Sequence, residues 1–358
     1  GATWFCAPTT ATGADDGFAE GTVLLANAGD VEARATVSVV SDAEEPTVEE
    51  VVVPAKTRLP LRLADLVTAE WAGAVIEVDQ GDVAVDHLVR GPTGVALAPC
   101  AATPTDRAWF PVGATEAGAR EVITVLNPFA DDAVLSLTFE TEDGSRTPED
   151  LEARVVPPRS IVVIELGDRV AVRREVATTV AVTSGQVVIE RLQSYDGTGD
   201  RAGLALDGGA PRPAGAWWFP GVELADDRSA SVVLVNPDRQ DVSSVEVAVR
   251  VDGVDPADQP EPFEVEVAPG RYLVVPLDRD GRVPVGSSAV SVRAVTGPPV
   301  VAELVGTSGQ RDEATGELVP DGFSLSSGSP VAAHRWVIPY GSLGGPGPAP
   351  GSGVNPGV

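Results

Sequence analysis

Residues 121–128 read Glu-Val-Ile-Thr-Val-Leu-Asn-Pro, and this stretch decides the fold class. Its branched and aliphatic side chains favour a β-strand, because branched Cβ atoms suit a pleated surface. Asn127 and Pro128 end the run, since asparagine tolerates turn geometry and proline cannot donate a hydrogen bond inside a sheet. Trp109-Phe110-Pro111 opens the same segment. The pattern predicts a short strand inside an all-β domain.

The same order of motifs occurs three times along the chain. A Trp-Phe pair opens each segment, and an apolar run that ends in asparagine follows it. The pairs are Trp4-Phe5, Trp109-Phe110 and Trp218-Phe219, and the asparagines are Asn27, Asn127 and Asn236. More Val-rich runs follow at intervals of about 8–12 residues, which is typical of a β-sandwich. We therefore expect three tandem immunoglobulin-like β-sandwiches in an extended array, with a barrel as the alternative.

These motifs set the expected domain boundaries. We place the three domains at residues 1–104, 105–212 and 213–341, followed by a tail at 342–358 that is rich in Gly and Pro and is expected to be disordered. Trp336 opens a fourth segment that does not continue. Either the Trp336 strand packs on the third domain, which we favour, or it begins a fourth domain.

Charge and composition exclude several functions. The chain has 53 acidic and 25 basic residues, a net charge of −28, so it should repel nucleic acid. Lys56 is the only lysine, and abundant Arg, Ala, Val, Gly and Pro indicate a GC-rich genome, of an actinobacterium or a haloarchaeon. No run of 18 apolar residues exists, so any membrane attachment needs an anchor outside this segment. The sequence contains no methionine, even at its first position, which suggests a mature or trimmed chain.

Two cysteines lie at opposite ends of the first segment. We expect Cys6 and Cys100 to form a disulfide between the first and last strands, with two buried thiols as the alternative. On the chain-entropy model, a bond that closes a loop of this length stabilises by roughly 4–5 kcal/mol. Pro111 and Pro220 stand where the motif alignment places Cys6. A structural disulfide implies an oxidising, extracellular compartment.

The sequence shows no catalytic constellation. The two histidines, His87 and His334, lack a neighbouring triad motif. Asp86, Glu190 and Glu303 recur at matched positions, which favours a structural role, with Glu190 and Arg191 as a strand-edge ion pair. A single active site would instead need one unshared carboxylate pair. We therefore expect no enzyme.

Two features of the sequence bear on binding. Among the tryptophans at the repeat starts, Trp217 is the only one that does not occupy the repeated motif position. An exposed Trp217 would therefore be a binding surface for carbohydrate. We expect no cofactor. Calcium is the weak candidate, at the Asp-rich turns that contain Asp196, Asp200, Asp278 and Asp280, but none of them fits the complete twelve-residue calcium loop.

The motif set resembles an uncharacterised family of exported or membrane-anchored actinobacterial proteins. It consists of the Trp-Phe opening, Val-Leu-Asn-Pro, Val-Val-Pro-Pro and Val-Ile-Glu-Arg. The family has no established activity, and the resemblance implies a cell-envelope location. The predicted function is therefore a non-enzymatic extracellular array with a structural, adhesive or protein-interaction role. The alternative is a protein that binds cell-wall glycan, and a glycan hydrolase is the third choice.

Overall fold

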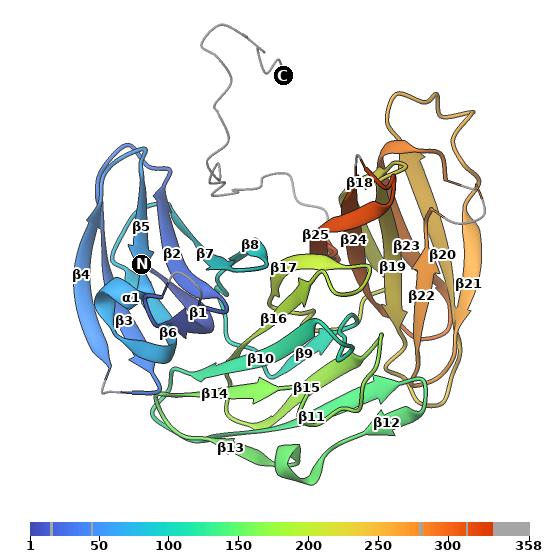
Figure 1. Cartoon of the computed structure of the whole chain (residues 1–358). Helices are drawn as coiled ribbons and strands as arrows, with labels where there is room; N and C mark the ends of the chain where they lie inside the picture. The colour runs from blue at the N-terminus through green and yellow to red at the C-terminus, as the bar shows by residue number, and fades with distance from the viewer. Residues whose placement is uncertain (15–16, 44–45, 279–280, 282, 313, 332–358) are drawn as a thin grey trace, which may run out of the picture.

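The computed structural model of the chain describes residues 1–331 except 15–16, 44–45, 279–280, 282 and 313. The described residues form β-strands almost throughout, as predicted (Figure 1). The helical elements among them are a single turn, α1 (Leu63–Leu66), and a 3-10 turn, η1 (Glu149–Leu151). The predicted tail and Trp336 lie outside the described residues.

The first repeat supplies eight strands. They are β1 (Ala2–Ala11), β2 (Glu20–Asn27), β3 (Ala33–Ser41), β4 (Thr47–Val53), β5 (Arg58–Arg62), β6 (Ala69–Val78), β7 (Val83–Gly91) and β8 (Gly94–Pro99). One half has the order β4-β3-β6-β1, and the other has β8-β7-β2 with β5 also paired to β2. A single parallel pair, Thr10 with Glu20, links the two halves.

The second repeat has the same plan in two separate sheets. Its strands are β9 (Arg107–Phe110), β10 (Ala119–Asn127), β11 (Ala133–Thr141), β12 (Gly144–Arg146), β13 (Arg154–Val156), β14 (Ser160–Glu165), β15 (Ala177–Ser184), β16 (Val188–Asp196) and β17 (Ala202–Asp207). The sheets have the orders β14-β10-β16-β17 and β12-β11-β15-β9, with β13 paired to β11. The short strands β12 and β13 together take the place of β4.

The third repeat also forms two separate sheets with the same plan. Its strands are β18 (Ala216–Leu224), β19 (Arg228–Val235), β20 (Ser243–Val251), β21 (Phe263–Val267), β22 (Tyr272–Pro276), β23 (Gly286–Thr296), β24 (Val301–Arg311) and β25 (Leu318–Ser327). The sheets are β18-β23-β20-β21 and β22-β19-β24-β25.

Strand pairing is the same in all three repeats. Counted along each repeat, strand 1 pairs with strand 6, strand 3 with 4 and 6, strand 2 with 5 and 7, and strand 7 with 8. Immunoglobulin constant domains share the pairings of strands 2 with 5 and 3 with 6, but their seventh strand pairs with the sixth. Here the seventh strand pairs with the second, so the likeness to that fold is a loose one.

Each repeat encloses a buried cluster between its two sets of strands, and the cluster of the third repeat extends to Trp109, Ala177 and Ala210 of the second. Alternating side chains supply it, because successive residues of a strand point to opposite faces. Val23, Val37 and Ile76 belong to the first cluster. Ile123 and Leu137 belong to the second, and the third cluster is built in the same way around strands β18 to β24. Independent folding of each repeat remains a prediction.

The asparagine that ends strand 2 has a structural role in every repeat. The Asn127 side chain donates to the carbonyl oxygens of Asp131, Val156 and Pro157, at 2.8–3.0 Å. Asn27 and Asn236 make the corresponding bonds, and all three are buried. The amide therefore ties the end of strand 2 to the end of strand 4 or its substitute, which explains the recurrence of this residue.

The three repeats follow an arc rather than a straight line (Figure 1). The edge strands β8, β17 and β25 lie at its inner side, and β17 contacts both of the others. Apolar side chains fill both junctions. Trp71 and Val89 meet Leu192 and Leu206 at the first, while Tyr195 of the second repeat meets Phe323 and other residues of the third. The expected extended array is therefore bent, because each junction buries apolar surface on one side.

Candidate functional site

The tryptophan predicted to form a binding surface is buried. Trp217 is 1% exposed, and its indole Nε1 donates a hydrogen bond to the Val300 carbonyl oxygen at 2.8 Å. The neighbouring Trp218 is 43% exposed. Only one of two successive strand residues can face the core, and in β18 that residue is Trp217. The prediction of an exposed Trp217 is wrong.

The strand register shows the source of this error. The Trp-Phe pair of the first repeat is one residue out of step with the other two pairs. The residues that share one position of strand 1 are Cys6, which lies opposite Ala74, Phe110, which lies opposite Thr178, and Phe219, which lies opposite Val290. Trp4 and Trp217 are therefore equivalent, and Cys6 does not correspond to Pro111 or Pro220 as the motif alignment predicted.

The predicted disulfide between Cys6 and Cys100 is confirmed in the structure, with the two Cα atoms 4.7 Å apart. The other repeats fill the same place with an aromatic ring over a glycine. Phe110 lies over Gly209 and Phe219 over Gly328, so closely that an added Cβ would lie 2.7 Å from a ring atom. The first repeat thus has a covalent bond where the other two have apolar packing.

Strand 7 carries an acid at one register position in every repeat, as the sequence indicated. Asp86 lies opposite Leu24, Glu190 opposite Thr124 and Glu303 opposite Val233. The next residue is His87, Arg191 or Leu304, respectively. The predicted ion pair between Glu190 and Arg191 does not form, because neighbouring strand residues point to opposite faces.

The acid instead pairs with the base of the preceding repeat. At the first junction, His87 Nδ1 lies 3.1 Å from Glu190 Oε2. The other ring nitrogen, Nε2, lies 3.2 Å from the hydroxyl oxygen of Thr9. All three side chains are buried, with exposures of 0–2%. The contact joins the first repeat to the outer face of β16.

The second junction repeats this contact with an arginine. Arg191 donates to both carboxylate oxygens of Glu303 and, at 3.2 Å, to Asp207 Oδ2. It also donates to the Val112 carbonyl oxygen, while the Val112 N–H donates to Glu303. Burial raises the pKa of Glu303 to about 7, although the charge of Arg191 opposes the rise. One fully buried cation therefore pairs with Asp207 of its own repeat and with Glu303 across the interface.

A third acid, Glu121, completes the second cluster. Burial raises its pKa to about 8, against the opposing effect of Arg191 and of a hydrogen bond from the Ala114 N–H to Oε2 at 3.0 Å. Glu121 is therefore mainly protonated at pH 7. Its Oε1 atom, both polar side-chain atoms of Gln193 and Arg191 Nε are buried without a hydrogen-bond partner. The second junction thus contains a polar interior that its own side chains leave partly unsatisfied.

The hydrogen-bond relay Thr9–His87–Glu190 has the order of a hydroxyl nucleophile, a base and an acid. A catalytic hydroxyl must reach a substrate, but Thr9 is 0% exposed. The register position of His87 is filled by Arg191 at the second junction, and arginine does not serve as a general base because it stays protonated. The arrangement is therefore a junction contact that the two interfaces share.

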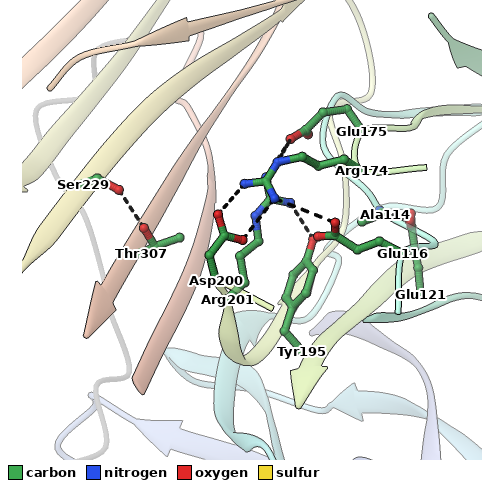
Figure 2. A network of polar contacts seen from close by, with 10 residues as sticks. All are labelled: Ala114, Glu116, Glu121, Arg174, Glu175, Tyr195, Asp200, Arg201, Ser229 and Thr307. Carbon is green, nitrogen blue, oxygen red and sulfur yellow. Dashed lines mark hydrogen bonds and ion pairs between the residues drawn. The ribbon is translucent and has the colours of Figure 1, made fainter. Parts of the chain in front are cut away.

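A surface network lies beside the second junction (Figure 2). Arg174 makes a two-fold contact with Asp200, at 2.7 and 3.1 Å. Arg201 donates to Glu175 at 2.6 Å and to the Tyr195 hydroxyl at 2.9 Å. A cavity of 160 Å³ lies between this network and residues of the third repeat that include Ser229 and Thr307. Because both arginines are already paired with carboxylates, the network is better suited to holding the second and third repeats together than to binding an anion.

The residues predicted as weak calcium ligands do not lie together around one site. Asp200 is engaged by Arg174, which lowers the pKa of its carboxyl group. Asp196 accepts a hydrogen bond from the Thr198 N–H at 2.8 Å and forms a turn. Asp278 lines the 160 Å³ cavity, and Asp280 lies outside the described residues. In the part of the chain that the structure describes, no group of three or more His, Cys, Asp or Glu side chains could hold a metal ion.

A larger cavity, of 540 Å³, lies where the three repeats meet. It is lined by the segment after β8, by the end of β17 and by residues of β25, including Pro99, Glu190, Asp207 and Ser327. Ser327 donates to Asp207 Oδ1 at 2.8 Å, so this contact links the second and third repeats at the cavity wall. Two of the junction acids thus border a cavity to which all three repeats contribute.

Residues 90–339 match the profile of a family of unknown function, DUF5719. The chain belongs to this family. The DUF5719 match covers the described second and third repeats and the second junction cluster, while Thr9 and His87 of the first junction lie before it, and it confirms the predicted membership of an uncharacterised family. The actinobacterial source and the export implied by the resemblance stay predictions.

No curated protein matches the chain. Among solved structures, the chain is similar to one titled "Crystal Structure of Thermotoga maritima 1070", at 17% identity over 28% of this chain and 94% of that one. The TM-score is 0.25. No helix in the described residues has the length and apolar character needed to cross a membrane.

Sequence reasoning missed the inter-repeat partners. The acids were identified, but their bases lie about 100 residues away, as the His87–Glu190 and Arg191–Glu303 contacts show. One signal was present in the sequence: the acid and the base occupy successive positions of strand 7 in two repeats. Such a pair cannot bond within one strand, so each member needs a partner elsewhere.

Proposed function

We propose that this chain is a non-enzymatic, extracellular scaffold of the cell envelope, built from three loosely immunoglobulin-like β-sandwiches and used for adhesion or protein interaction. One observation carries the proposal: the buried charged side chains of strand 7 serve the junctions between repeats. They hold the repeats at fixed angles, and a protein whose task is to present surfaces in a fixed relation needs that property. We also propose that the chain comes from an actinobacterium.

Several features support a scaffold over an enzyme. The constellation most like a catalytic triad, Thr9–His87–Glu190, is closed to solvent and has a counterpart at the other junction that lacks a general base. The disulfide and the absence of a membrane-spanning helix among the described residues are compatible with an extracellular protein. Burial of Trp217 removes the residue on which the alternative of glycan binding depended.

The test pairs a binding assay with an activity assay. Immobilised chain is offered to purified envelope proteins and cell-wall polymers, and wild type is compared with Glu303→Gln, which weakens the second junction. We expect saturable binding of a protein partner that falls in the variant, because the partner contacts more than one repeat. Hydrolysis of an ester, peptide or glycan substrate that Thr9→Ala or Glu190→Gln abolishes would contradict the proposal.

A further inference from the structure

The central cavity, which lies where the three repeats meet, is a candidate ligand site. Its volume of 540 Å³ lies within the usual range of small-molecule sites, roughly 300–1,000 Å³. Residues from every repeat line it, and they provide apolar side chains, carboxylates and a guanidinium group. The groups that remain available there indicate the chemistry of a ligand.

A leucine from each repeat lines the central cavity. Leu97, Leu206 and Leu325 occupy the same register position of strand 8, opposite the residue that follows the base position of strand 7. Leu206 is buried, and the other two leucines are part-buried. The repeat thus brings three equivalent apolar side chains to one space, where the apolar part of a ligand can be removed from water.

The two junctions engage their acids to different extents. Glu303 accepts hydrogen bonds from Arg191 with both carboxylate oxygens, whereas His87 reaches only Oε2 of Glu190. The hydrogen bonds of the described residues leave Glu190 Oε1 without a donor, and this atom is not sealed from solvent, unlike Oε1 of Glu121. Glu190 lines the central cavity and is 2% exposed. One carboxylate oxygen is therefore available to a donor that enters the cavity.

The opposite charge in the cavity wall comes from Arg107, an exposed residue. Its guanidinium group lies over the Trp109 ring, 5.3 Å from the ring centre, and no ion pair within the described part of the chain engages it. Asp207, the other acid in the wall, is already occupied, because its two oxygens accept from Ser327 and Arg191. The cavity thus offers one available carboxylate oxygen and one unpaired guanidinium group.

These groups are complementary to a zwitterion with an apolar body. An ammonium group donates hydrogen bonds to a carboxylate, and a guanidinium group binds a carboxylate through two parallel N–H donors. A ligand with only one of the two charges would leave either Glu190 Oε1 or Arg107 unpaired. Short peptides with free ends carry both charges and add apolar side chains.

We propose that the central cavity binds a short apolar peptide with free ends. The peptide ammonium group donates to Glu190 Oε1, its carboxylate accepts from Arg107, and its side chains lie against the three strand-8 leucines. The site needs all three repeats, so the junction contacts that fix the arc also form the cavity. This activity goes beyond the proposed scaffold role, because peptide binding depends on no protein partner.

Isothermal titration of the full chain tests the proposal. The probes are alanyl-leucine and alanyl-alanyl-leucine, whose lengths cover two separations of the charged ends. We expect saturable binding of at least one probe. Its N-acetylated form, which lacks the ammonium group, and its C-terminal amide, which lacks the carboxylate, should each bind at least about tenfold more weakly, because each loses a charge-assisted hydrogen bond.

Variants locate the two ends of the peptide. Glu190→Gln and Arg107→Gln should each weaken binding of the free peptide at least about tenfold. Glu190→Gln should not further weaken binding of the acetylated form, and Arg107→Gln should not further weaken binding of the amide. The matched controls Asp132→Asn and Arg34→Gln, at an exposed acid and an exposed base, should change nothing. Thermal unfolding checks that each variant is folded, and Arg107→Gln alters an exposed side chain outside the buried junction pairs.

Three outcomes would overturn the proposal. The first is the absence of saturable binding of either probe at millimolar concentration. The second is equal binding of the free peptide and its acetylated or amidated form, which would show that the charged ends are not recognised. The third is binding that Arg107→Gln leaves at the wild-type level while the variant unfolds at the wild-type temperature, which would place the peptide elsewhere on the chain.

Discussion

The first and second repeats meet the same two structural needs with different side chains. Strand 1 is fixed to the end of strand 8 by the Cys6–Cys100 disulfide in the first repeat and by Phe110 over Gly209 in the second. The base that the first repeat presents to its neighbour is His87, and the second presents Arg191. The difference shows that register positions are kept while their chemistry changes, so the positions define the architecture.

The largest expected effect comes from removing the buried arginine. Arg191→Met should destabilise the chain by about 3–5 kcal/mol, because Glu303 and Asp207 lose their common cation inside the protein. Chemical denaturation measures the change. The control Arg293→Met removes a base that is 60% exposed and paired with Glu246, and should cost less than about 1 kcal/mol. Equal losses in the two variants would show that the junction cluster stabilises no more than a surface pair.

The second largest effect on stability is expected from replacing the disulfide of the first repeat. Cys6→Ser with Cys100→Ser should cost about 2–5 kcal/mol, since the unfolded chain regains the freedom of a loop of 94 residues. Cys6→Phe with Cys100→Gly copies the second repeat and should recover part of that loss. Thermal unfolding of the three proteins without reductant, with the wild-type disulfide intact, measures both effects. If the Phe and Gly variant is no more stable than the double serine variant, the two solutions are not equivalent.

The pH dependence of the second junction is the third prediction. The pKa of Glu121 is raised by burial from 4.5 to about 8, so the folded state holds this proton more tightly than the unfolded state. The contribution is complete below about pH 4.5 and is lost as the pH rises towards 8. Wild type should therefore lose stability on the order of 5 kcal/mol between these limits, and Glu121→Gln should not show this loss. Denaturation midpoints at several pH values test it, and parallel pH profiles for wild type and variant would contradict it.

The smallest effect separates a junction contact from a catalytic relay. Thr9→Val removes the hydroxyl near His87 Nε2 at nearly constant volume and should cost about 0.5–1.5 kcal/mol. Thr9→Ser keeps the hydroxyl and should cost less. Urea denaturation provides the comparison. A serine variant that gains or keeps hydrolytic activity while the valine variant loses it would favour the relay.

Local patterns in the sequence were sufficient for the strands, the repeat and the disulfide. Alternating Val-rich runs define strands, and the terminal asparagines mark equivalent ends, so the all-β class and the positions of Asp86, Glu190 and Glu303 followed directly. The orientation of Trp217 did not follow, because a shift of one residue reverses the face of a strand. The repeat register that would have fixed it lies in the partner strands rather than in the Trp-Phe motif.

Partners between repeats could not be predicted for a different reason. His87 and Glu190 are 103 residues apart, and nothing local specifies which face of one repeat lies on the next. The arc depends on these contacts, together with the apolar clusters around Trp71 and Tyr195. Their geometry comes from the packing of whole repeats, which no single stretch of sequence encodes.

The central claim is that buried charge pairs hold the three repeats in one fixed arrangement. A pulsed electron paramagnetic resonance measurement tests it directly, with spin labels at Val48→Cys in β4 and Val295→Cys in β23, both exposed positions. The account predicts one narrow distance distribution in the wild-type background, which Arg191→Met broadens. A broad distribution in the wild-type background would mean that the repeats move independently, and would contradict it.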